Sequence, residues 1–261
     1  MTQRLNRDQM ANGDGRDRFF LWMALALLAF VIIGFAPSFF LRPITDAPPL
    51  RTHILIHAVT LTAWFVWFVG QTAMIQAGNV RLHRSLGVAG AIIGAVCVVT
   101  GPLATTTAIE SLLATGVSWD SDMSEEPTRG IEGISVAQFG PALVFGNIAS
   151  TIAFAVLLAA GIGFRRRADF HKRLMLLASI SFIGPAISRI ARWPVFRGED
   201  GLFIPVAFGG LLVAIWLYDR KSLGYIHKAT LLGSLTLVGL LIAGLVFSAT
   251  PWGLAIAKSM A

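Results

Sequence analysis

Seven apolar segments, each about long enough to cross a lipid bilayer, follow one another along this 261-residue chain. A membrane-spanning α-helix needs about 20 predominantly apolar residues. The segments cover residues 19–41, 53–76, 85–108, 134–164, 172–192, 203–218 and 230–250. In lipid the backbone must satisfy its own hydrogen bonds, so consecutive segments of this kind fold as helices. The sequence therefore predicts an all-α, polytopic membrane bundle of about seven transmembrane helices.

The composition agrees with a membrane protein and excludes several other classes. Only 13% of the residues are charged, whereas soluble domains carry roughly 25%. The mean hydropathy is +0.71, which excludes an ordinary water-soluble domain and a disordered chain. Cys97 is the only cysteine, so an intrachain disulfide and a cysteine-rich metal or iron–sulfur site are excluded as well.

The 21 Lys and Arg residues lie mainly in the short segments between the apolar spans. Cytoplasmic loops of membrane proteins carry an excess of such residues. With the N-terminus inside, 14 of them fall on the inner side and seven on the outer side. The inner ones are Arg4, Arg7, Arg16, Arg18, Arg81, Arg84, Arg165, Arg166, Arg167, Lys172, Arg173, Arg220, Lys221 and Lys228. This asymmetry predicts an N-in, C-out protein of the bacterial cytoplasmic membrane. No basic helix with interleaved aromatic residues is present, so no nucleic-acid partner is expected.

Two polar segments accompany the membrane domain. Residues 1–18 are mixed in charge and too poor in apolar residues to form a core, and we interpret them as a cytoplasmic N-terminal segment. Residues 19–261 then form a single transmembrane domain. Within it, the loop 109–133 holds six Asp and Glu residues against one Arg, and the orientation places it in the periplasm. Pro185, inside the fifth span, predicts a kink.

Three of the five histidines begin helices on the inner side. They are His83, His171 and His227, and each precedes a basic residue: Arg84, Lys172 or Lys228. The free N–H groups and the dipole at a helix N-terminus disfavour an imidazolium, so we expect neutral rings that can bind a metal. Two such histidines on different helices at one membrane level can ligate a haem b from opposite faces, with the basic residues neutralising its propionates. In the alternative interpretation, these residues contact anionic lipid at the cytoplasmic face.

The other two histidines, His53 and His57, lie four residues apart on one face of the second span. The same face continues through polar and aromatic residues, which are Thr60, Trp64, Trp67 and Gln71. Polar residues at membrane depth usually face the protein interior, so we expect this face to point inward, with Leu61 and Phe65 on other sides. The histidine pair is a candidate metal site. Its alternative role is hydrogen bonding to neighbouring helices or headgroups.

Several familiar motifs are absent from the sequence. It contains no Walker motif, no Rossmann glycine fingerprint and no Gly-x-Ser-x-Gly elbow, so no enzyme class is predicted. No acidic residue lies deep in a predicted span, which argues against a proton pump of the carboxylate-relay type.

Two histidine motifs carry a resemblance to known families. Residues 83–87 (HRSLG) resemble helix starts of uncharacterised bacterial multi-pass membrane proteins, and residues 171–175 (HKRLM) are similar to the His-Lys/Arg-x-x-Met start of small proteins implicated in cytochrome oxidase assembly. The plan of helix-end histidines in a small bundle also resembles haem-bearing cytochromes of the b561 type. These resemblances imply haem or redox association.

Three functions remain open from the sequence. The first is a haem- or metal-linked membrane protein in electron transfer or oxidase biogenesis. The second is a non-catalytic accessory subunit of a larger respiratory or photosynthetic membrane complex. The third is a small-solute transporter.

Overall fold

A computed structural model describes residues 2–44, 49–123, 134–193, 195 and 200–260, with side chains from residue 18 onward except at 200 and 201. The described part of the chain is almost entirely helical. Its elements are α1 (Thr2–Phe35), η1 (Ala36–Phe40), η2 (Arg42–Ile44), α2 (Thr52–Gln76), α3 (Val80–Leu113), α4 (Val136–Gly163), α5 (Ala168–Ser181), α6 (Gly184–Ala191), α7 (Asp200–Leu223), α8 (Lys228–Ser248) and α9 (Pro251–Ser259). The prediction of an all-α polytopic bundle is confirmed.

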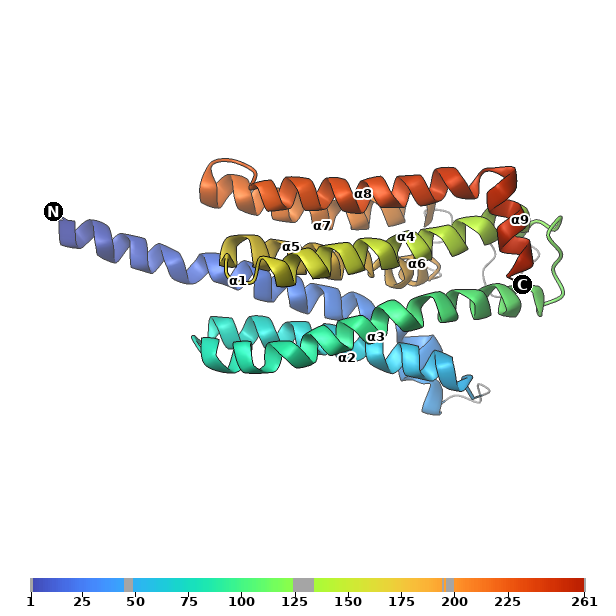
Figure 1. Cartoon of the computed structure of the whole chain (residues 1–261), viewed down its shortest axis with the longest axis horizontal. Coiled ribbons are helices and arrows are strands. Elements are labelled where there is room, and N and C mark those ends of the chain that lie inside the picture. The colour runs from blue at the N-terminus through green and yellow to red at the C-terminus, as the bar shows by residue number, and fades with distance from the viewer. Residues whose placement is uncertain (1, 45–48, 124–133, 194, 196–199, 261) are drawn as a thin grey trace.

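Among the described residues, six helices are long and apolar enough to cross a membrane, and the number is seven if the bent pair α5–α6 forms one span. Most predicted boundaries agree to within a few residues. The predicted loop 109–133 was too long, because α3 continues to Leu113, and residues 124–133 of that loop lie outside the described residues. Residues 2–17, predicted as a polar segment, continue helix α1 and project beyond the bundle (Figure 1).

The bend between α5 and α6 has a local cause. The two helices meet at an angle of 45°, and Pro185 is the second residue of α6. Proline lacks the N–H that would bond to the carbonyl four residues earlier, and its ring clashes with that carbonyl. That carbonyl belongs to Ser181, the last residue of α5. The kink predicted from Pro185 is therefore confirmed.

The connections alternate between the two ends of the bundle. The turns at 77–79, 164–167 and 224–227 lie at the same end as the N-terminus, and we call this the histidine end (Figure 1). The segment after α3, helix α9 and the C-terminus lie at the opposite end. The three histidine-bearing helix starts thus share one level, as predicted.

Helix α5 lies at the centre of the bundle, where α1, α4 and α8 pack around it. Every residue of α5 from Leu176 to Ser181 is buried. Large aliphatic side chains on the outer helices are exposed instead, for example Val88, Val99 and Leu232. An exposed apolar surface of this kind is what a bundle embedded in lipid requires.

A candidate cofactor site at the histidine end

The structure brings His83 and His171 together, although they are separated by 88 positions in the sequence. Each is the fourth residue of its helix, α3 or α5. Their ring centroids lie 6.1 Å apart, and the ring planes are inclined at 78°. Both residues are half-buried. Two of the three predicted histidines therefore form a pair between helices that do not follow one another in the chain.

The tautomer of His171 is fixed by the end of a neighbouring helix. The last four carbonyls of an α-helix have no partner within that helix, and Gly161 belongs to this last turn of α4. The Nδ1–H of His171 donates to the Gly161 carbonyl oxygen over 2.8 Å. In the neutral ring this leaves the lone pair on Nε2, which is the usual arrangement of a metal-binding histidine whose other nitrogen is held by a carbonyl.

Buried polar atoms without a hydrogen-bond partner among the described residues occur on His83 and on the second half of α2. The buried Nδ1 of His83 has no hydrogen-bond partner among the described residues. The same holds for three atoms at the adjoining half of α2: Trp67 Nε1, Gln71 Nε2 and Gln76 Oε1. Because buried polar groups are normally satisfied, we expect water or a bound group to complete the hydrogen bonding of these atoms.

The third histidine, His227, has a different role. It is the N-cap of α8, and its Nδ1 accepts a hydrogen bond from the backbone N–H of Ala229 over 3.1 Å. Its Nε2–H donates to Asp169 Oδ2 over 3.0 Å. Since both ring nitrogens are engaged, His227 has no free lone pair for a metal in this arrangement.

Beside His227 lies a buried ion pair that the sequence did not predict. Arg173 on α5 donates from Nε and Nη2 to Asp219 Oδ1 on α7, at 2.9 and 2.6 Å. Asp219 is fully buried, and its Oδ2 accepts from the backbone N–H of His227 and from the Thr230 hydroxyl. This Arg173–Asp219 cluster ties α5, α7 and α8 together. In the sequence, this ion pair could have been found only from Asp219, an acidic residue directly after an apolar span.

The predicted basic partners of a haem are dispersed. The Lys172 ammonium lies over the rings of Phe20 and Tyr218, toward α1 and α7. Arg84 and Lys228 are exposed at the histidine end. Lys172 follows His171 directly in the chain, but its ammonium lies over these aromatic rings and not over the histidine pair.

At the opposite end, His53 and His57 each hydrogen-bond to a threonine of α3. His53 Nε2 lies 2.6 Å from Thr107 Oγ1, and His57 Nδ1 lies 3.3 Å from Thr100 Oγ1. Within the described ranges, no group of three His, Cys, Asp or Glu residues is placed to hold a metal ion. The two residues therefore fit the alternative role, hydrogen bonding between helices.

The polar face of α2 points inward, as predicted. Trp64 is 2% exposed, and its Nε1–H donates to Ser179 on α5 over 3.3 Å. Leu61 and Phe65 were expected on other sides of the helix, yet they are buried too, because α1 also packs against α2. Helix α2 thus buries two adjacent faces, which a single polar stripe does not reveal.

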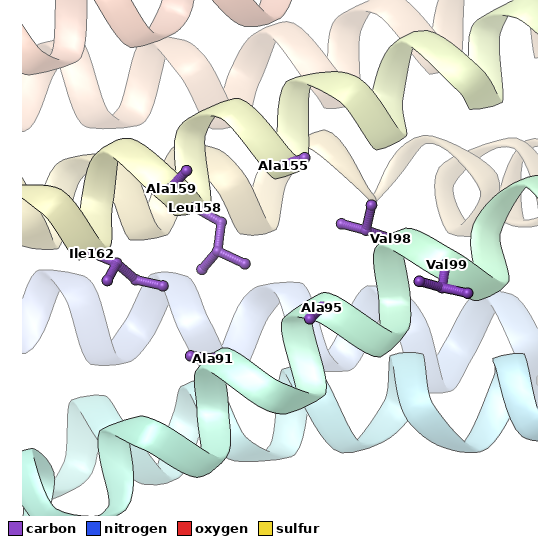
Figure 2. Close-up of a pocket in the computed structure, with 8 residues that line it drawn as sticks. All are labelled: Ala91, Ala95, Val98, Val99, Ala155, Leu158, Ala159 and Ile162. Atoms are coloured by element: carbon purple, nitrogen blue, oxygen red, sulfur yellow. The ribbon is translucent and has the colours of Figure 1, made fainter.

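A groove of about 420 Å³ lies between α3 and α4. Alanines line much of it, at Ala91 and Ala95 of α3 and at Ala155 and Ala159 of α4 (Figure 2). The remaining lining residues are also aliphatic: Val98, Val99, Leu158 and Ile162. The lining thus suits a hydrocarbon chain of the surrounding lipid rather than a polar solute.

Comparison with known protein families, with curated proteins and with solved structures found no match for this chain.

Proposed function

We propose that His83 and His171 are the axial ligands of a haem b, and that the protein carries electrons at the histidine end of the membrane domain. The observation that supports this proposal is the ring pair itself. Two histidines from different helices lie at one level with centroids 6.1 Å apart, and the Gly161 carbonyl engages Nδ1 of His171, not Nε2.

The separation suits two ligands on opposite sides of one metal. An imidazole bound through one nitrogen at about 2.0–2.1 Å has its ring centroid about 3.2 Å from the metal. Two such rings on opposite sides of the metal have centroids about 6.4 Å apart, whereas a tetrahedral angle brings them to about 5.2 Å. The observed 6.1 Å is closer to the opposed arrangement.

The number of ligands favours haem over a bare metal ion. A zinc or copper ion needs three or four protein ligands, and the described residues bring no third His, Cys, Asp or Glu to a common site. Haem iron needs only two axial residues and, when bound, supplies a one-electron redox couple.

The first test is the absorption spectrum of the full-length protein purified from haem-replete cells. We expect a Soret band that shifts on reduction with dithionite, as axial bis-histidine ligation requires. Metal analysis of the same sample is the control for a bare ion. A colourless protein without stoichiometric iron would refute the proposal and favour an accessory subunit of a larger membrane complex.

We also propose an orientation, with the histidine end in the bacterial cytoplasm. The support is the basic asymmetry of the sequence. In intact cells, a Ser118→Cys variant should react with a membrane-impermeant maleimide, because Ser118 is exposed at the opposite end. The native Cys97 is 1% exposed, so the background should be low. If labelling required disruption of the membrane, the result would indicate the opposite orientation and contradict this proposal.

A further inference from the structure

Helix α9 lies where the chain leaves the membrane. The spanning helix α8 ends at Ser248, and α9 begins three residues later at Pro251. Figure 1 shows α9 crossing the end of the bundle rather than continuing the direction of α8. Because α8 is long and apolar enough to span the hydrocarbon, its end marks the level of the headgroups, and α9 lies at that level.

One face of α9 is firmly docked on the bundle. Gly253 and Ala257 are buried, and α9 packs against α4 and α8. A Cβ at position 253 would clash with the Phe247 carbonyl oxygen, so only glycine permits this approach. The Thr250 hydroxyl accepts from the Gly253 N–H over 3.0 Å and caps the helix. The orientation of α9 is therefore fixed by the fold.

The exposed sides of α9 differ in chemistry. Trp252 is 75% exposed and Ile256 is 41% exposed, and residues four apart share one helix face. Lys258 lies on another side, with its ammonium 5.8 Å from the centroid of the Trp119 ring in the segment after α3. The helix thus has a docked side, an apolar side and a basic side.

We propose that α9 is an interfacial anchor whose partner is the lipid surface at this end of the bundle. Trp252 and Ile256 enter the boundary between headgroups and acyl chains, where tryptophan is enriched in membrane proteins. Lys258 is exposed and faces the aqueous side, while the Trp119 ring beside it packs against the bundle. An amphipathic helix lying in the membrane plane has this division of faces. The anchor sets the depth of this end of the bundle and, through Trp119, supports the segment after α3.

The experiment places one spin label at a time on full-length protein in liposomes, with Cys97 replaced by alanine. The labelled variants are Trp252→Cys, Ile256→Cys and Lys258→Cys. Val99→Cys, on the exposed side of α3, is the hydrocarbon reference, and Ser118→Cys is the aqueous reference. Oxygen accessibility reports lipid, and accessibility to a water-soluble nickel chelate reports water. Size-exclusion elution identifies variants that fail to fold.

The labels at 252 and 256 should show an oxygen-to-nickel accessibility ratio several-fold higher than the label at 258, and between the ratios at 118 and 99. If the ratios at 252 and 256 equalled that at 118, α9 would lie in water, and the proposal would be overturned. If both labels were shielded from both reagents, protein would cover this face, which would equally overturn it.

Discussion

Replacing Asp219 with alanine is expected to destabilise the protein by about 3–5 kcal/mol, because a buried charge then loses its partner. Arg173 is 2% exposed, and Asp219 accepts two of its hydrogen bonds. The variant also leaves the backbone N–H of His227 and the Thr230 hydroxyl without their acceptor. Denaturant unfolding in a mild detergent measures the change.

The matched control is Glu110→Ala, which breaks the Arg51–Glu110 pair at the opposite end. Those side chains are 59% and 43% exposed, and exposed pairs contribute about 0–1 kcal/mol. Replacing both members of the buried pair, in an Arg173→Met/Asp219→Leu variant, should recover much of the loss, since no unpaired charge remains. Equal small effects of Asp219→Ala and Glu110→Ala would contradict the role given to the buried cluster.

Gly34→Ala is expected to destabilise the contact between α1 and α6 by about 1–3 kcal/mol, the usual cost of overpacking a tight core. An added Cβ would lie 2.5 Å from the backbone carbonyl oxygen of Ala186, and backbone cannot rotate away as a side chain can. Thermal unfolding in detergent measures the effect.

Gly239→Ala serves as the comparison within a spanning helix. Nothing lies within 4 Å of its added Cβ, and alanine is roughly 0.5–1 kcal/mol better than glycine inside a helix. This variant should therefore be neutral or slightly stabilised. The tight α1–α6 crossing would be refuted if Gly34→Ala behaved in the same way.

The spans and their order could be predicted from the sequence because each depends on the local chain. An apolar run of bilayer length specifies a helix by itself, and Pro185 specifies the bend between α5 and α6 through its own missing N–H. The shared level of the three histidine-bearing turns also follows, since successive spans must return to alternate sides of the membrane.

The pairing within the site could not be predicted, because it depends on how the helices are rotated and which of them are neighbours. His83, His171 and His227 look alike in sequence, yet His227 is an N-cap whereas the other two lie one turn into their helices. The pairing of Arg173 with Asp219 could not be predicted either, because the two residues lie 46 positions apart on different helices. The burial of Leu61 and Phe65 likewise follows from the contact of α2 with α1.

The most direct test of the haem proposal compares the haem content of four alanine variants purified in parallel with the wild type. His83→Ala and His171→Ala remove the two proposed ligands, while His53→Ala and His227→Ala remove histidines that hydrogen-bond to Thr107 and Asp169 instead. Circular dichroism and size-exclusion elution establish which variants fold. We predict that folded His83→Ala and His171→Ala proteins lose nearly all low-spin haem, whereas folded His53→Ala and His227→Ala proteins keep it. A folded His83→Ala or His171→Ala protein with the wild-type spectrum would contradict the account.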